Sequence, residues 1–233
     1  QLPENIPILR IVDPWMSQVM SEWCLLHVLR FHRQALEYAA ITAAKAWTKL
    51  PFPDTAKRRV GIMGLGALGS DLAGKLTALG FPVRGWSRSP KNLPGVTSFA
   101  GEDALADFLA DTEILVNLLP LTLDTRDLMT TARFNQMPAG SFVINAGRGA
   151  TMVEPDLLAA INTGQIAGAA LDVFCEEPLP QDHGFWGHAK IDIWPHVAAQ
   201  TNPDTATRQI VDNIRRLMAG EKPVNEVNFN RQY

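Results

Sequence analysis

The sequence has few of the features that mark secreted and membrane proteins. Only two of its 233 residues are cysteines, Cys24 and Cys175. Two cysteines are too few for a disulfide framework, and such sparse use fits a reducing compartment. No secretory signal peptide is recognisable, and no apolar run is long enough to span a membrane. We therefore expect a cytoplasmic protein.

Strong charge is also absent. The formal net charge is −3, and no long run of like charges occurs. Nucleic acids and anionic membrane surfaces attract basic patches, so we expect neither as a partner. Carboxylates and cysteines do not cluster at the spacings of metal ligands, so no metal is expected. Small polar metabolites are the expected ligands.

What the sequence does contain is a regular alternation of strands and helices from Arg59 onward. Hydrophobic residues make up 46% of the chain, enough to bury one large core or two modest ones. The short apolar runs read RRVGIM, PVRGW, EILVNLL, SFVINA, IAGAALDVF and KIDIW. Because helical segments separate them, they predict parallel βαβ units in an α/β doubly wound sheet of the Rossmann type.

Helices are predicted on either side of this region. Asp13 and Pro14 predict a helix start, and a helical stretch, whole or broken, continues toward Trp47. An Asn-Pro pair at 202–203 predicts the start of the last helix in the same way.

The first apolar run leads directly into VGIMGLGALGSDLAGKL. Gly64, Gly66 and Gly69 form a GxGxxG pattern between a predicted strand and a predicted helix. In dinucleotide-binding folds these glycines allow a tight turn, close approach of a pyrophosphate and close packing of the helix. The amides of Ala67, Leu68 and Gly69 would face the pyrophosphate at the helix N-terminus. A glycine-rich turn without a ligand is the alternative.

An acidic residue is missing where an NAD site would have one. About 20 residues beyond the fingerprint, an Asp or Glu binds the ribose 2′-hydroxyl of NAD. No acid occurs between Asp71 and Glu102, and the second predicted strand ends in WSRS. Ser87 stands at about the position of the acid, and the planar fork of Arg88 suits a phosphate. The stretch therefore predicts NADP(H), with a solvated surface turn as the alternative.

Three chemically versatile residues follow predicted strands. Arg148 follows SFVINAG, Glu177 follows IAGAALDVFCE, and His196 follows KIDIWP. Ligands of open α/β sheets bind beyond the carboxyl ends of the strands. A protonated histidine beside a carboxylate can protonate a carbonyl oxygen during hydride transfer, and an arginine can polarise that carbonyl. Taken singly, each has an ordinary explanation as a surface arginine, a loop glutamate or a structural histidine.

In these motifs the sequence resembles the D-isomer-specific 2-hydroxyacid dehydrogenases. The matching segments are VGIMGLGALG, INAGRGA, LDVFCEEPLP and WPHVAAQT. Within that family it is most similar to glyoxylate/hydroxypyruvate reductases, in GFPVRGWSRSPK, NLLPLTLDTRDLM and EKPVNEVNFNRQY. The resemblance implies a homodimeric, NADPH-dependent enzyme that reduces glyoxylate or hydroxypyruvate. The alternative is a cofactor-sensing interaction protein, because some relatives on this fold act as co-repressors.

The resemblance also implies roles for individual residues. Arg148 would bind the substrate and polarise its carbonyl, and Glu177 would pair with His196, the general acid. The resemblance also implies three cofactor-binding residues. Leu119 and Pro120 would line the cofactor cleft, and Asp172 would bind the nicotinamide carboxamide.

A domain division follows from the same resemblance. Family members begin with a smaller flavodoxin-like substrate domain, and most of it is expected to be absent from this chain. Residues 1–12 would be a remnant of that domain, and residues 13–201 the dinucleotide-binding domain with its dimerisation helix. Residues 202–233 would form a C-terminal helix and tail that return toward the substrate domain. Trp194 departs from the family pattern, because relatives often carry a hydroxyl residue there.

Overall fold

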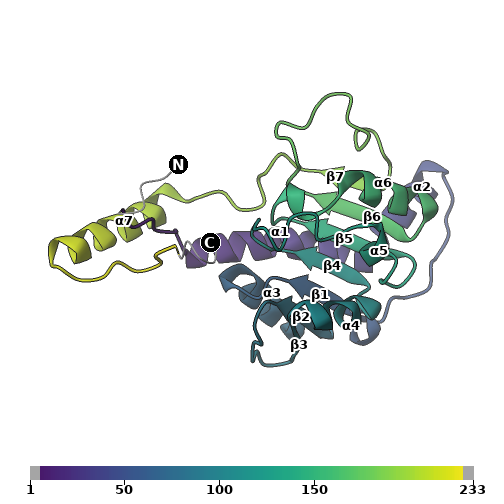
Figure 1. Ribbon diagram of the computed structural model, residues 1–233. Helices are drawn as coiled ribbons and strands as arrows, with labels where there is room; N and C mark the ends of the chain where they lie inside the picture. The colour runs from purple at the N-terminus through teal and green to yellow at the C-terminus, as the bar shows by residue number, and fades with distance from the viewer. Residues whose placement is uncertain (1–5, 228–233) are drawn as a thin grey trace.

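The computed structural model describes residues 6–227, which form a parallel sheet with helices on both faces (Figure 1). Within this range seven strands lie in the order β3-β2-β1-β4-β5-β6-β7, and every neighbouring pair is parallel. The strands are β1 (Val60–Met63), β2 (Val83–Ser87), β3 (Val96–Ala100), β4 (Ile114–Asn117), β5 (Ser141–Asn145), β6 (Ile166–Leu171) and β7 (Ile191–Ile193). The predicted doubly wound α/β sheet is confirmed.

The apolar pattern predicts every strand except β3. This strand lies at the edge of the sheet beside β2, and its residues are exposed or half-buried. An edge strand of this kind needs no continuous apolar run. The central strands β1 and β4, by contrast, are buried at every position, which is what their apolar runs predict.

The winding of the sheet reverses at its centre. From β1 the chain proceeds through β2 to β3, then crosses to β4 on the other side of β1 and continues outward to β7. In open α/β sheets, ligands bind in the crevice outside the carboxyl ends of the strands where the order reverses. The segments that follow β1 and β4 therefore border the expected binding crevice.

Helices pack on both faces of the sheet. One apolar cluster joins α1 and α3 to one face, and a second joins α4, α5 and α6 to the other. The α-helices are α1 (Pro14–His32), α2 (Ala35–Ala43), α3 (Ala67–Ala78), α4 (Leu105–Ala110), α5 (Thr131–Phe134), α6 (Glu154–Thr163) and α7 (Pro203–Met218). Short 3-10 helices are η1 (Thr55–Lys57), η2 (Glu102–Ala104) and η3 (Gly149–Thr151). No helix between residues 6 and 227 combines the length and hydropathy that crossing a membrane requires.

The first helical stretch is broken in two. The Asp13 side chain caps α1 by accepting from the Trp15 amide at 2.9 Å, as the sequence predicts. Gln34 separates α1 from α2 with a φ of 58°, a left-handed conformation that interrupts the helix. α1 packs along α3 with one face, while Leu26 and Leu29 remain exposed on the other.

α7 extends away from the sheet, beside the segment that precedes α1 (Figure 1). The Asn202 side chain caps α7 by accepting from the Asp204 amide at 3.0 Å, again as predicted. The Gln209 side chain bonds the amide and the carbonyl of Val12 at 3.0 and 2.6 Å. These contacts fasten the N-terminal segment to α7 rather than to the sheet.

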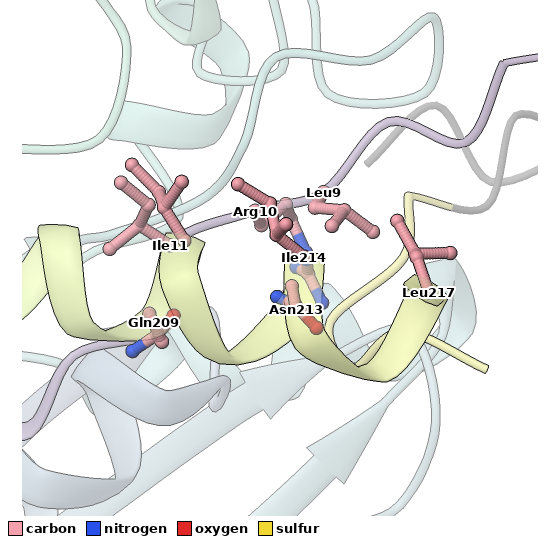
Figure 2. Close-up of a pocket in the computed structure, with 8 residues that line it drawn as sticks. Leu9, Arg10, Ile11, Gln209, Asn213, Ile214 and Leu217 are labelled. Carbon is pink, nitrogen blue, oxygen red and sulfur yellow. The ribbon is translucent and has the colours of Figure 1, made fainter. Parts of the chain in front are cut away.

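An apolar groove lies between α7 and that N-terminal segment (Figure 2). It has a volume of about 250 Å³, and its apolar lining includes Leu9, Ile11 and Leu217. Ile210 and Ile214 on the same helix are each 50% exposed. α7 is therefore amphipathic, with part of its apolar face open to solvent.

Candidate active site

The glycine-rich turn between β1 and α3 has two glycines that the fold itself requires. Gly64 has a φ of +99°, and a Cβ there would lie 2.9 Å from the Leu118 carbonyl oxygen. A Cβ on Gly69 would lie only 1.9 Å from the Gly64 carbonyl oxygen, so a side chain would push α3 away from the turn.

Gly66 is not explained by packing. Its φ of −76° is open to any residue, and a Cβ there would meet nothing within 4 Å. Gly66 precedes the first turn of α3, where the amides of Ala67, Leu68 and Gly69 have no partner inside the helix. Amides at a helix N-terminus attract anions. The open space beside them fits a pyrophosphate that approaches the backbone closely.

The cationic stretch at the end of β2 lies next to this turn. The Gly64 amide donates to the Trp86 carbonyl at 2.8 Å, which brings the two strand ends together. Ser87 is the last residue of β2 and donates its hydroxyl to the Ser89 carbonyl at 2.7 Å. Arg88 follows and is exposed. Its position beyond the carboxyl end of β2 is that of a residue that contacts the ribose side of a dinucleotide.

Arg84 from the same stretch has a structural role instead. Its guanidinium lies 4.4 Å from the centre of the Phe99 ring and donates to the Asp107 carbonyl at 2.6 Å. It therefore fastens β2 to β3 and α4.

The opposite wall of the crevice follows β4. Leu119 is buried and Pro120 half-buried, and the Leu119 amide donates to Asn117 Oδ1 at 3.3 Å. A Cβ on Gly147 would lie 2.7 Å from the Leu119 carbonyl oxygen, so the segments after β4 and β5 touch without room for a side chain. The wall predicted to hold the cofactor thus adjoins the loop that carries Arg148.

A pocket of about 280 Å³ opens beyond the carboxyl ends of β5 and β6. The side chains of Arg148, Glu177 and His196 all line it, although the first and the last lie 48 positions apart in the sequence. The remaining lining residues are Leu121, Gly149, Ala150, Phe174 and Cys175. The fold therefore brings the three predicted strand-end residues to one place.

Glu177 and His196 form a direct pair in this pocket. His196 Nδ1 lies 2.7 Å from Glu177 Oε2, and Glu177 Oε1 accepts from the Phe174 amide at 2.9 Å. Burial acts to raise the pKa of Glu177, but the hydrogen bonds from His196 and Phe174 and the charge of Arg148 outweigh it and lower the pKa. The carboxylate is therefore ionised at neutral pH and oriented toward the imidazole.

The backbone of His196 is held in an unusual conformation. Its φ is 55°, in the left-handed region that a non-glycine residue seldom adopts, and its amide donates to the Asp172 carbonyl at 2.9 Å. The buried Asp172 carboxylate accepts from the Val197 and Ala198 amides at 2.8 and 3.0 Å. Burial raises the pKa of Asp172, and these amide bonds offset the increase only in part. Asp172 thus holds both sides of the His196 loop.

The sequence patterns do not reveal a cluster of buried polar side chains next to the loop that carries Arg148. Asn117, Asn145 and Thr151 are buried and hydrogen-bonded to one another. The one available signal is an asparagine at the fifth position of each of the mainly apolar runs EILVNLL and SFVINA. That signal does not reveal that the two asparagines meet.

The pocket suits the chemistry of a carbonyl. An arginine can polarise the carbonyl oxygen or bind a carboxylate, and a histidine with a carboxylate partner can exchange a proton with that oxygen. Among residues 6–227, no group of three or more histidine, cysteine or acidic side chains is arranged to bind a metal ion.

Comparison of the sequence with known families agrees with this geometry. Residues 25–198 match the profile of the D-isomer specific 2-hydroxyacid dehydrogenase NAD binding domain. The glyoxylate/hydroxypyruvate reductase A of Yersinia enterocolitica is 45% identical over 232 residues, covering 100% of this chain and 74% of that protein. The corresponding protein of Serratia proteamaculans is 46% identical over 226 residues, covering 97% of this chain and 72% of its own length.

Solved structures give the same relationship. A D-isomer specific 2-hydroxyacid dehydrogenase from Xanthobacter autotrophicus Py2, in complex with NADPH and MES, superposes with a TM-score of 0.96 at 44% identity, covering 98% of this chain and 95% of that chain. The NADPH-dependent glyoxylate/hydroxypyruvate reductase of Sinorhizobium meliloti, in complex with NADP and sulfate, has a TM-score of 0.96 at 38% identity, covering 100% of this chain and 74% of that one.

Proposed function

Because the chain belongs to the D-isomer specific 2-hydroxyacid dehydrogenase family, we propose that it reduces glyoxylate or hydroxypyruvate to the 2-hydroxy acid with NADPH. That it is an NADP(H)-dependent enzyme of this family is already established by its relatives, several of which were solved with NADPH or NADP. The choice of substrate and the role of each residue are the proposal.

The cofactor residues follow from the glycine turn and the strand ends. The amides of Ala67, Leu68 and Gly69 bind the pyrophosphate, and the open space at Gly66 allows its close approach. When bound, NADPH supplies a hydride to the carbonyl carbon of the substrate. The remaining cofactor contacts in the proposal are made by Gly64, Ser87, Arg88, Leu119, Pro120 and Asp172.

His196 donates the proton that completes the reduction. Its Nδ1 is occupied by Glu177 Oε2 at 2.7 Å, so Nε2 is the atom that remains for the substrate. Nε2 gives its proton to the carbonyl oxygen while the ionised Glu177 stabilises the imidazolium and fixes its orientation. Arg148 polarises the same oxygen and binds the substrate carboxylate, whose charge it complements.

The observation that carries this proposal is the shared pocket of Arg148 and the His196–Glu177 pair. The experiment is an assay of NADPH oxidation by the full-length protein against a panel of 2-oxo acids. Turnover of glyoxylate or hydroxypyruvate supports the proposal. Tight NADPH binding with no turnover of any 2-oxo acid would favour the alternative, a cofactor-sensing interaction protein.

The domain division of the family is carried over as part of the proposal. Residues 13–201 are the dinucleotide-binding domain, and residues 1–12 and 202–233 belong with the substrate domain, although residues 1–5 and 228–233 lie outside the described part of the chain. Supporting this, α7 bonds the segment before α1 and leaves the apolar groove of Figure 2 open beside it.

We also propose a homodimer that uses the outer face of α1 and the segment after α2. Leu26 is 51% exposed on α1, and Trp47 and Phe52 are 98% and 83% exposed beyond α2. Such large exposed apolar side chains are typical of protein interfaces. Sedimentation of the wild type and of Trp47→Ser tests this, with a monomeric wild type as the contrary result.

The free cysteines in the structure support a reducing compartment such as the cytoplasm.

A further inference from the structure

A buried amide side chain connects the loop of Arg148 to the sheet. Asn117 ends β4, and its register partner Asn145 ends the neighbouring strand β5. Both side chains are buried, at 0% and 2% exposure, and Thr151 in η3 is 1% exposed. Buried polar groups are costly unless they are hydrogen-bonded, so their partners indicate what they hold in place.

Asn117 uses both ends of its amide. Nδ2 donates to Asn145 Oδ1 at 2.9 Å and to Thr151 Oγ1 at 2.7 Å, so both of its protons are engaged. Oδ1 accepts from the backbone amide of Leu119 at 3.3 Å. Because a backbone N–H can only donate, this last bond fixes which end of the side chain is oxygen.

Asn145 and Thr151 extend this anchoring to both sides of Arg148. Thr151 Oγ1 donates to the Arg148 carbonyl at 2.6 Å, so the same hydroxyl must accept from Asn117. Asn145 Oδ1 accepts from the Gly147 amide at 3.1 Å. One amide group therefore holds the loop from 145 to 151 at its beginning and at its end, with Arg148 between them.

We propose that Asn117 is a positioning residue for the reaction, acting through Asn145 and Thr151 to fix the backbone from which the Arg148 guanidinium enters the substrate pocket. The proposal rests on the function proposed above for Arg148. The same amide holds Leu119 in the cofactor wall, so one buried group sets the spacing between that wall and the arginine.

The orientation of Arg148 depends on this backbone. Its side chain is exposed, and its guanidinium donates to the carbonyl of the adjacent Gly147 at 2.6 Å. A displacement of about 1 Å in a group that positions substrate can lower the rate about 10²-fold. Thr151 is buried and does not line the pocket, so a change there reaches the substrate through the loop that carries Arg148.

The test uses isosteric variants of the full-length protein. Thr151→Val removes the hydroxyl and keeps the shape, whereas Thr151→Ser keeps the hydroxyl. Asn117→Leu removes the amide at similar size. Ser141→Ala is the matched control, because Ser141 is 2% exposed at the other end of β5 and its hydroxyl also bonds backbone carbonyls. For each variant, kcat and KM for glyoxylate, Kd for NADPH and Tm are measured.

We expect Thr151→Val to lower kcat/KM for glyoxylate by about 10- to 100-fold with Kd for NADPH unchanged. Thr151→Ser should recover most of the loss, and Ser141→Ala should change only Tm. Adding Thr151→Val to Asn117→Leu should cause little further loss, since both break the same connection. A fall in Tm alone, or a loss that Thr151→Ser does not recover, would overturn the proposal.

Hydrogen exchange separates this proposal from the function it rests on. If the wild type reduced no 2-oxo acid, the proposed function would have failed, and exchange would test the anchoring by itself. The Gly147 amide bonds Asn145, and the Thr151 amide bonds the Arg148 carbonyl at 3.2 Å. Both should exchange faster in Thr151→Val than in Ser141→Ala. Equal exchange in the two variants would overturn the anchoring.

Discussion

The carboxylate of Glu177 contacts the imidazole of His196 through one oxygen and a backbone amide through the other. Oε2 lies 2.7 Å from His196 Nδ1, and Oε1 accepts from the Phe174 amide at 2.9 Å. The second bond prevents the carboxylate from turning away, so the charge stays beside the imidazole. This arrangement makes the pH dependence of the enzyme a direct test of the pair.

We expect Glu177→Gln to lower kcat/KM for reduction at neutral pH and to remove one acid-side step from its pH dependence. In the wild type the ionised Glu177 favours the charged imidazole, and this effect is lost as the pH falls through the lowered pKa of Glu177. Glutamine carries no charge at any pH, so the variant lacks that step. The profile of Glu176→Gln, which removes the adjacent exposed carboxylate, should match the wild type.

The pair of Glu177 and His196 also affects the stability of the folded chain at acidic pH. Because the pKa of Glu177 is lowered in the folded chain, its ionised form contributes stability above the ordinary pKa of a glutamate, and this contribution is lost as the pH falls through the lowered pKa. Tm measured from neutral pH downward should therefore fall less in Glu177→Gln than in the wild type. An identical pH dependence of Tm in both would mean that the pair adds nothing to folding.

Gly66→Ala should separate cofactor binding from folding. The Cβ would meet nothing within 4 Å at a φ of −76°, so Tm should stay within a few degrees of the wild type. The methyl group would occupy the space needed by the pyrophosphate, so NADPH binding should weaken at least about 10-fold, or 1.4 kcal/mol. Calorimetry and thermal unfolding measure the two effects.

Gly69→Ala is the matched comparison for that variant. Its Cβ would lie 1.9 Å from the Gly64 carbonyl oxygen, so the fold itself must shift. We expect a clear loss of Tm in Gly69→Ala and none in Gly66→Ala. If Gly66→Ala bound NADPH as tightly as the wild type, the pyrophosphate would not lie against this turn.

Arg88→Ala tests the choice between cofactors. If Arg88 binds the 2′-phosphate, its loss should weaken NADPH binding by about 1–3 kcal/mol, the range for hydrogen bonds to charged groups, and leave NADH binding nearly unchanged. Arg208→Ala, which removes an exposed arginine on α7, should leave both affinities unchanged. Equal losses for NADPH and NADH in Arg88→Ala would contradict the assignment.

Features that depend on local sequence were predicted well. The caps at Asp13 and Asn202 and the glycine turn are local, because the residues that form them are close in the chain. Arg148 and His196 were predicted to lie in one region because both follow strands, and the carboxyl ends of parallel strands share one edge of the sheet. The structure places both in one pocket.

Other features depend on what a residue meets across the fold. β3 was not predicted, because an exposed edge strand carries no apolar run. The different environments of Arg84 and Arg88 could not be predicted either, since only packing shows that Arg84 stacks on Phe99. The bonds that join Asn117 to Thr151 depend on which strands are neighbours, and composition does not reveal that.

The most direct test of the proposed mechanism is the kinetics of His196→Asn in the full-length protein. Asparagine adopts the left-handed conformation of residue 196 readily, and it lacks an atom at the position of Nε2, so the loop is kept while the proton donor is lost. The mechanism predicts that kcat for glyoxylate falls about 10²- to 10⁴-fold while Kd for NADPH is unchanged. Turnover close to that of the wild type would contradict the assignment of His196 as the general acid.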